Sequence, residues 1–455
     1  MPCLRIICAL LTASAAIAQT TPLDTASIAA SANQELTATK TPGAAIGIVE
    51  NGRLIYAKGF GTADIETGAS ITADTLFRLG STTKMMTAAA VVSLAAEGKI
   101  DLQAPVGNYI HGLDPAIAAL TANQLLSHTA GLKDEAIMNG RHDDAALGEE
   151  IRAWKSDWLF TKPGAIFSYA NPGYWLAGLL AETVAGKPYA DVMQDRVFGP
   201  VGMRCTTLRP LMAMTRPLAQ GHDVVEGKIV VLRPAPDNAA NWPAGSVFSN
   251  INDLSRFVIA MMNGGKLEGK QVLSPKVVME LTTTHAHAFG WKTGYGYGLN
   301  VQDSDGVRAW LHGGARAGYG SEIAMLPGRQ SAVIVLCNRS GQNLEKTRLR
   351  IWAMLGGPPP EKHEMTDSAI PASEFSRYAG MYRNGGNTMK IAERDGALFL
   401  DAQELRKGTG NWLVAKPAGG KAEEQIYAAP GADGKVEYLY AGGRAAIRVP
   451  DPTQH

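Results

Sequence analysis

A serine and a lysine stand one helical turn apart, at Ser81 and Lys84. At spacing i, i+3 the two side chains share one face of a helix. The apolar run from Met85 to Gly98 predicts such a helix, with Gly98 just beyond its C-terminal end. Serine becomes a nucleophile when a neighbouring base takes its proton, and a desolvated lysine is one such base. The pair therefore indicates acyl transfer at Ser81, where free N–H groups at a helix N-terminus favour developing negative charge.

A second motif, Tyr169-Ala-Asn171, follows a turn-rich segment that begins at Pro163. A lysine ammonium near the Tyr169 phenol would lower the pKa of that phenol, which could then pass protons to and from the serine oxygen. The Asn171 amide offers donors and an acceptor for a substrate ester or amide group.

A third motif, His312-Gly313-Gly314, ends a strand-like run and precedes Ala315. Paired glycines let the backbone approach a ligand closely. The edge of a strand at this place would bind a substrate main chain as an additional strand.

In this order and spacing, the three motifs resemble the serine β-lactamase and penicillin-binding-protein superfamily. The resemblance is strongest to the branch related to class C β-lactamases, which includes esterases and D-amino-acid peptidases. It spans roughly residues 41–355 and includes the phrase Leu125-Leu-Ser-His-Thr-Ala-Gly-Leu132. It implies that Ser81 is the acylated nucleophile, Lys84 its partner and Tyr169 the general acid/base.

The resemblance also implies the surroundings of the reacting carbonyl. The backbone N–H groups of Ser81 and Ala315 would form the oxyanion hole, each worth roughly 3–4 kcal/mol in comparable enzymes. Asn171 and the His312-Gly313-Gly314 strand would contact the substrate.

One departure from the family pattern concerns this strand. Family β-lactamases and penicillin-binding proteins usually have Lys-Thr-Gly where this chain has His312-Gly313-Gly314. Histidine is only partly charged near neutral pH and Gly313 has no hydroxyl, which argues against strong β-lactamase or D-alanyl-D-alanine carboxypeptidase activity. Arg316 would replace the lost anion contact, or else be an outward-facing surface arginine.

The N-terminus and the composition predict an exported protein without a membrane span. Arg5, the apolar run 6–17 and Ala16-Ile17-Ala18 have the pattern of a secretory signal peptide, residues 1–18. No later stretch reaches 18 apolar residues. Loss of Arg5 with the signal leaves 42 basic and 42 acidic side chains, a balance that excludes an electrostatic surface for nucleic acid.

Cysteine usage gives no disulfide framework. Cys3 and Cys8 leave with the signal, so only Cys205 and Cys337 remain. One bridge between them stays open as an alternative, but the strand-like run around Cys337 favours a buried, inert thiol.

The order of the patterns predicts an α+β fold. A helix is expected at 25–39, a hairpin around Asn51-Gly52, mostly helices at 81–260, strands at 294–302, 309–313, 322–326 and 332–338, and a helix at 343–355. This favours an antiparallel sheet flanked by helices, together with a helical lobe. We expect a hydrolase domain at 19–357, a linker at 358–370 and a lipocalin-like antiparallel barrel or sandwich at 371–455.

Several other patterns favour packing over chemistry. Adjacent residues such as Ser127-His128 do not normally face each other, and the spacing around His285-Ala-His287 lacks further metal ligands. The pairs Trp154/Trp158 and Tyr295/Tyr297 are expected to be core aromatics before pocket walls. We expect no metal and no cofactor.

The sequence thus predicts an exported, periplasmic or secreted serine hydrolase that cleaves a small-molecule ester, amide or peptide through an acyl-enzyme on Ser81. The alternatives are a D-amino-acid peptidase or carboxypeptidase, a β-lactamase, and a penicillin-binding sensor that is acylated without turnover. The acyl and leaving groups and the oligomeric state stay open.

Overall fold

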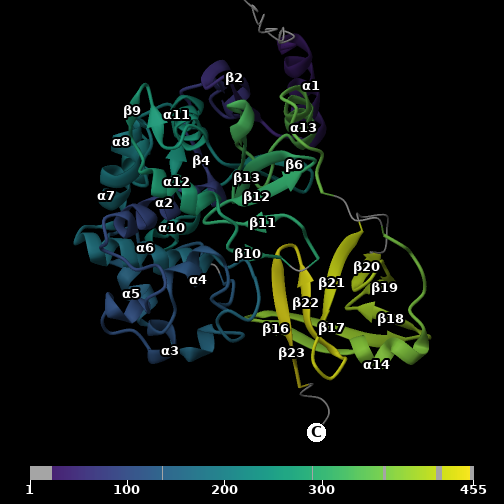
Figure 1. Ribbon diagram of the computed structural model, residues 1–455. Coiled ribbons are helices and arrows are strands. Elements are labelled where there is room, and N and C mark those ends of the chain that lie inside the picture. The colour runs from purple at the N-terminus through teal and green to yellow at the C-terminus, as the bar shows by residue number, and fades with distance from the viewer. Residues whose placement is uncertain (1–22, 136, 289, 362–364, 417–422, 451–455) are drawn as a thin grey trace, which may run out of the picture.

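The computed structural model describes residues 23–135, 137–288, 290–361, 365–416 and 423–450 (Figure 1). The predicted signal peptide, residues 1–18, lies outside this range. Within the described range, no helix combines the length and the apolar character needed to cross a bilayer.

A nine-stranded antiparallel sheet forms the centre of the larger part of the chain. In spatial order its strands are β10 (Ala286–His287), β11 (Gly294–Tyr295), β12 (Asn300–Ser304), β13 (Val307–Arg316), β14 (Tyr319–Leu326), β15 (Ser331–Cys337), β1 (Gly43–Glu50), β2 (Arg53–Asp64) and β3 (Ala69–Ser70). The N-terminal hairpin β1–β2 pairs through β1 with β15, the last strand of the C-terminal group. The predicted antiparallel sheet is confirmed, and this pairing shows how its two groups of strands join.

Helices surround this sheet and build a lobe beside it (Figure 1). They are α1 (Thr25–Thr39), α2 (Thr83–Ala96), α3 (Pro115–Ala118), α4 (Ala122–Leu126), α5 (Ala146–Arg152), α6 (Asn171–Ala185), α7 (Tyr189–Met193), α8 (Gly199–Val201), α9 (Pro210–Ala213), α10 (Trp242–Gly245), α11 (Ile251–Met262), α12 (Pro275–Thr282) and α13 (Glu345–Met354). Helix α14 (Phe375–Tyr378) instead packs on the C-terminal strands. Three two-stranded pairs join β4 (Phe77–Arg78) to β7 (Phe248–Ser249), β5 (His222–Val225) to β6 (Lys228–Val231) and β8 (Lys266–Leu267) to β9 (Lys270–Gln271).

Strand β1 is buried on both faces, which explains why its sequence is apolar without alternation. Ile46 and Ile48 belong to a core shared with α1 and α13. Ala45 and Val49 belong to the larger core of the helical lobe, which includes α2 and α11. The sheet is thus the middle layer between two groups of helices.

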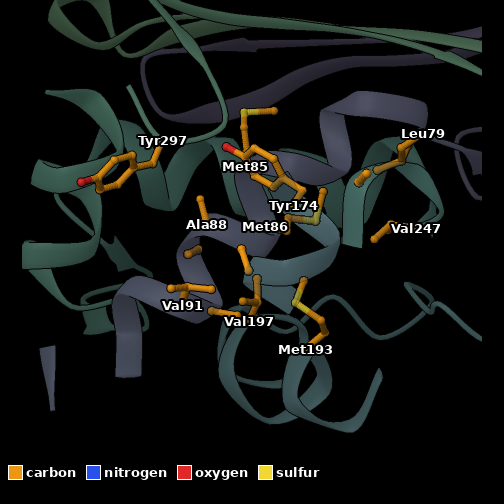
Figure 2. Packing of buried hydrophobic residues seen from close by; sticks show 14 of the residues in the cluster. Leu79, Met85, Met86, Ala88, Val91, Tyr174, Met193, Val197, Val247 and Tyr297 are labelled. Atoms are coloured by element: carbon orange, nitrogen blue, oxygen red, sulfur yellow. The ribbon is translucent and has the colours of Figure 1, made fainter. Parts of the chain in front are cut away.

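Helix α2 runs through the centre of the lobe and is covered almost all around (Figure 2). Met85, Met86 and Val91 pack there against Tyr174 of α6 and Val197. This burial requires the apolar circumference seen in the sequence. It also holds the start of the helix rigidly in the protein interior.

The C-terminal part of the chain is a closed eight-stranded antiparallel barrel, so the barrel or sandwich prediction is confirmed as a barrel. Its strands are β16 (Gly380–Asn384), β17 (Asn387–Arg394), β18 (Ala397–Leu400), β19 (Gln403–Lys407), β20 (Trp412–Lys416), β21 (Glu424–Pro430), β22 (Val436–Ala441) and β23 (Arg444–Val449). The barrel has a separate apolar core that includes Tyr382, Leu398 and Leu439.

The predicted single strand at 294–302 is two strands, β11 and β12, that pair with each other. Gly298 lies between them with φ +78°, a conformation that suits glycine and turns the chain back. A Cβ at Gly298 would meet the backbone of Lys84 at 2.6 Å, so the turn packs directly on α2.

The two described cysteines are free. Cys337 is buried in β15, and burial raises the pKa of its thiol. The expectation of a buried thiol at this position is confirmed.

Candidate active site

The Lys84 amine lies against the Ser81 hydroxyl at the start of α2. Ser81 sits in the 3-10 turn Gly80–Thr82 that leads into the helix, and Lys84 Nζ is 3.1 Å from Ser81 Oγ. Lys84 Nζ also donates hydrogen bonds of 2.8 Å to Asn171 Oδ1 and of 2.8 Å to the Ala244 carbonyl oxygen. The last two atoms only accept hydrogen bonds. In a neutral amine they take both N–H groups, which leaves the nitrogen lone pair directed to Ser81.

The Asn171 amide is oriented by Asp134. Asp134 Oδ1 accepts hydrogen bonds from Asn171 Nδ2 at 2.9 Å and from the Asn171 backbone N–H at 2.8 Å. Because the amide nitrogen is held by a carboxylate, the amide oxygen must face Lys84. Asn171 borders the cavity, and its amide oxygen holds the lysine amine.

Burial lowers the pKa of Lys84 to about 7. Desolvation is the main cause, the Asp134 carboxylate acts in the opposite sense, and the Arg444 guanidinium adds a smaller lowering. The side chain is fully buried. A large part of Lys84 is therefore a neutral base at neutral pH.

The Tyr169 phenol differs from the sequence expectation. Its ring centroid is 4.8 Å from Lys84 Nζ, so the predicted proximity holds. However, burial raises the pKa of Tyr169, with only a smaller lowering by the Ser81 hydroxyl. The expected lowering of the Tyr169 pKa is therefore wrong, because desolvation of the buried phenol dominates. No hydrogen bond of good geometry reaches the Tyr169 hydroxyl from the described residues, although Ser81 is close enough to affect its pKa.

The Ser81 turn and strand β13 touch through glycines. Gly80 has φ +57°, and a Cβ there would meet the Ala315 N atom at 2.7 Å. A Cβ on Gly314 would lie 3.1 Å from the Ser81 N atom and would overlap the Leu79 carbonyl oxygen. Only glycine at both places brings the backbone N–H groups of Ser81 and Ala315 together, as a shared oxyanion hole requires.

We expect Gly314→Ala to lower kcat/KM and to destabilise the protein. The new methyl group must push β13 away from Leu79, at a cost of about 1–3 kcal/mol for an overpacked site. Gly328→Ala is the matched control, since a Cβ there meets nothing within 4 Å. Thermal unfolding and steady-state kinetics of both variants test this, and a Gly314→Ala enzyme that matches the control contradicts it.

Strand β13 has a free edge beside Ser81. Its ladder with β12 ends at the pair Asn300–Leu311, whereas its ladder with β14 continues to Arg316. Residues 312–316 therefore border the cavity along one edge. This geometry fits the predicted addition of a substrate main chain.

A hydrogen-bonded chain links His312 to His128. The Ala170 N–H donates to His128 Nδ1 at 3.1 Å, His128 Nε2 lies 3.2 Å from the Tyr295 hydroxyl, and that hydroxyl lies 3.1 Å from His312 Nε2. His312 Nδ1 lies 2.6 Å from the Gly313 carbonyl, which can only accept. One proton arrangement satisfies every member, with both imidazoles neutral.

His312 is thus not the partly charged group that the sequence suggested. Burial and the neighbouring Lys84 lower the pKa of His312 to about 3. The imidazole stays neutral at neutral pH and supplies no charge for a substrate anion.

Arg316 differs from the second sequence alternative, a surface arginine, although it does line the cavity. It is buried, not outward-facing. Its Nη1 donates to Ser246 Oγ at 2.7 Å, its Nη2 to the Pro236 carbonyl at 2.9 Å, and Asp237 pairs with its charge at 3.5 Å. This arginine stabilises the end of β13 and has its charge already paired.

A cavity of about 870 Å³ opens in front of Ser81. The sheet and the helical lobe provide part of its wall, including Tyr169, Asn171 and the strand 312–316. The barrel provides the rest, through the side chains or backbone of Trp412, Gln425, Tyr440, Gly442, Gly443 and Arg444. The site therefore lies between the two parts of the chain.

Sequence reasoning missed Asp134, Tyr295 and Arg444 as members of this site. Tyr295 was assigned to packing, yet it lines the cavity and joins the two histidines. The structural interpretation of Ser127-His128 is confirmed, because Ser127 Oγ donates to the Asn123 carbonyl while His128 bonds elsewhere. The pair Trp154/Trp158 stacks with ring centroids 4.4 Å apart.

The comparison with known families identifies the class. A sequence profile of the Beta-lactamase family matches residues 28–355, well over half of the chain. The chain therefore belongs to the Beta-lactamase family and is a hydrolase of that family. The resemblance drawn from the three motifs is confirmed.

Individual relatives are moderately similar to this chain. Penicillin-binding protein 4 of Amycolatopsis lactamdurans is 28% identical over 314 residues, which cover 65% of this chain and 81% of that protein. Unguisins hydrolase ungD' of Aspergillus campestris is 29% identical over 322 residues, which cover 65% of this chain and 58% of that protein. The chain thus spans less than two thirds of the second relative.

Solved structures share the fold. The crystal structure of SurE superposes with a TM-score of 0.79 at 23% identity, covering 93% of this chain and 99% of that chain. The octameric penicillin-binding protein homologue from Pyrococcus abyssi gives a TM-score of 0.65 at 21% identity, and the match covers 94% of this chain and 97% of that chain. The α+β fold with a C-terminal antiparallel barrel is confirmed.

Proposed function

We propose that this hydrolase cleaves a small-molecule ester or amide through an acyl-enzyme on Ser81, with Lys84 as the base. The arrangement of the Lys84 amine carries the proposal. Two acceptor oxygens hold its N–H groups, and its nitrogen lies 3.1 Å from Ser81 Oγ. This is hydrogen-bond reach for direct proton transfer.

The proposed cycle has two steps. The proton of Ser81 Oγ moves to Lys84 Nζ while Oγ forms a bond to the substrate carbonyl carbon. Negative charge on the carbonyl oxygen lies against the N–H groups of Ser81 and Ala315. The bond from the carbonyl carbon to the leaving group breaks as Tyr169 gives its proton to that group, and Tyr169 receives one from the Lys84 ammonium. Water then adds to the acyl carbon and gives a proton to Lys84 Nζ, and the bond to Ser81 Oγ breaks as Oγ takes that proton back. Because burial raises the pKa of Tyr169, the phenol keeps its proton at neutral pH until the leaving group takes it.

We expect kcat/KM to rise as the pH increases through about 7. The pKa of Lys84 in the folded protein is lowered to about 7, and only the neutral amine accepts the serine proton. Below pH 7 the protonated fraction grows, so log(kcat/KM) should fall with a slope of one. A pH–rate profile with a neutral ester tests this, and a flat profile between pH 5.5 and 8.5 contradicts the role of Lys84.

A substrate panel tests the proposed reaction. Purified protein is mixed with short p-nitrophenyl esters, D-aminoacyl p-nitroanilides and nitrocefin. We expect turnover of esters or anilides and poor turnover of nitrocefin, because neutral His312 replaces the usual lysine. Absence of turnover of every ester and anilide would contradict the proposal. A single equivalent of product without turnover would favour the penicillin-binding sensor.

Peptides that contain D-amino acids form the second candidate substrate class. The free edge of β13 along residues 312–316 supports it, because a peptide main chain can pair there. SurE, which shares the fold, has been crystallised with D-Leu, and one relative is named as a hydrolase of unguisins. Faster turnover of D-aminoacyl anilides than of esters and L-aminoacyl anilides would support this class, and equal rates for the two enantiomers would contradict it.

Export and domain boundaries complete the proposal. The sequence of residues 1–18, with Arg5 before an apolar run and a small-residue end, supports a cleaved secretory signal and a periplasmic or secreted protein. The boundaries 19–357, 358–370 and 371–455 are supported by the Gly356-Gly-Pro-Pro-Pro360 segment. N-terminal sequencing and limited proteolysis test both statements.

A further inference from the structure

The barrel reaches into the catalytic centre at the turn between β22 and β23. Ala441 pairs with Arg444, so Gly442 and Gly443 form a two-residue hairpin turn, with φ +55° and +80°. Positive φ at both central residues is typical of a type I′ turn, which glycine favours. This turn fixes the start of β23.

Two hydrogen bonds, one between backbone groups and one to a serine hydroxyl, attach that start to the segment that carries Tyr169. The Tyr169 N–H donates to the Gly443 carbonyl at 2.9 Å, and the Ala445 N–H donates to Ser168 Oγ at 3.1 Å. Arg444 stands between Gly443 and Ala445 in the sequence. Its guanidinium lies 5.1 Å from the centroid of the Tyr169 ring.

Arg444 also binds the carboxylate that orients the lysine. Its Nε donates to Asp134 Oδ2 at 2.5 Å, while Asp134 Oδ1 holds the Asn171 amide. The Asp134 side chain is 8% exposed, against 42% for Arg444. A buried carboxylate is costly without a partner, and the Arg444 guanidinium of the barrel supplies that partner.

We propose that the barrel completes the active site and that Arg444 is a positioning residue, which holds the Lys84 amine toward Ser81 through Asp134 and Asn171. The inference rests on the proposed function of Ser81 and Lys84. Three hydrogen-bonded steps connect the guanidinium to the amine, and every one of them is between described side chains. The C-terminal barrel is then a working part of the catalytic centre as well as a wall of the cavity.

The charges around Lys84 give this role a measurable signature. Titratable or charged groups from the loops and from α6, β13 and β23 face the amine, namely Asp134, Tyr169, Tyr174, His128, His312 and Arg444. Burial keeps the two histidines neutral and the two phenols protonated. Of these described groups, Asp134 and Arg444 are therefore the two that carry charge beside Lys84, and they act on its pKa in opposite directions.

The test measures the rate at which a neutral fluorophosphonate probe labels Ser81, from pH 5.5 to 9.5. We expect Arg444→Gln to lower this rate about ten- to a hundredfold at pH 7, because the amine loses its alignment. The midpoint of the pH profile should rise by about one pH unit, since Asp134 then acts on Lys84 unopposed. The rate should recover in part at high pH, which a merely misfolded variant would not show. Arg444→Lys keeps the charge and should restore the midpoint.

A matched control and a double-mutant cycle sharpen the test. Arg383, exposed on the neighbouring strand β16, gives the control Arg383→Gln, which should behave as the wild type. In an Asp134→Asn background, Arg444→Gln should lower the labelling rate less than about threefold, because the two residues act through one contact.

Three results separate this inference from its foundation. An unchanged rate and midpoint in Arg444→Gln would overturn it, as would full additivity with Asp134→Asn. A guanidinium that only binds a substrate carboxylate would give that unchanged rate, since the probe is neutral. A wild-type protein whose Ser81 is not labelled at all would contradict the proposed function itself, and this inference with it.

Discussion

Ser81→Ala is expected to lower kcat at least about 10³-fold on every substrate that the wild type turns over, because no acyl-enzyme can form. Among the described residues, Ser81 Oγ makes one hydrogen bond, with Lys84 Nζ, and its loss costs about 1 kcal/mol. The melting temperature should therefore change by no more than about 2–4 °C.

Ser93→Ala is the matched control for this variant. Ser93 lies on the same helix, and its hydroxyl donates to the Ala90 carbonyl, away from the cavity lining. Kinetics and thermal unfolding of both variants should show full activity for Ser93→Ala and a similar melting temperature for the two. Undiminished turnover by Ser81→Ala would end the proposed mechanism.

Lys84→Met is expected to lower kcat/KM about 10²–10⁴-fold, the usual contribution of a general base. The methionine side chain fills about the same buried volume as the lysine side chain but accepts no proton. The residual activity should no longer depend on pH near 7, since the group that titrates there has been removed. Lys99→Met, at an exposed lysine just beyond the same helix, should keep the wild-type profile.

The stability of Lys84→Met separates a chemical effect from a structural one. The variant leaves Asn171 Oδ1 and the Ala244 carbonyl without the lysine donor, at a cost of about 1–3 kcal/mol for a buried acceptor. The substitution also removes the free-energy cost of burying the Lys84 amine. A folded variant with little activity supports the role of Lys84 as the base. A folded variant with the wild-type rate and the wild-type fall in activity at low pH contradicts it.

Local patterns predicted much of the fold because the relevant forces act between near neighbours in sequence. The apolar run after Lys84 gave helix α2, and Asn51-Gly52 gave the β1–β2 turn. The break at Gly298 was missed because its cause is a contact with the backbone of α2, far away in sequence.

The reacting groups were found for a similar reason. Ser81 and Lys84 were recognised from their short spacing at the start of a helix. Tyr169 and the strand at His312 were recognised from compact sequence motifs. Their contacts in the structure agree with that assignment, since the Lys84 amine lies within reach of both the serine hydroxyl and the tyrosine ring.

Asp134 and Arg444 could not be predicted in this way. They are separated by 310 positions, and nothing in a single sequence relates them. The predicted lowering of the Tyr169 pKa and the expected partial charge of His312 were also wrong, because desolvation depends on the whole surrounding structure. Only the position of Asp134, just beyond the phrase that ends at Leu132, was a usable signal.

One measurement tests the central claim most directly, namely mapping where a fluorophosphonate attaches to the intact wild-type protein. We predict one adduct, carried by the peptide that contains Ser81, formed faster above pH 7 than below it and absent from Ser81→Ala. An adduct on a different residue, or ester turnover that continues with Ser81 unmodified, would contradict the account.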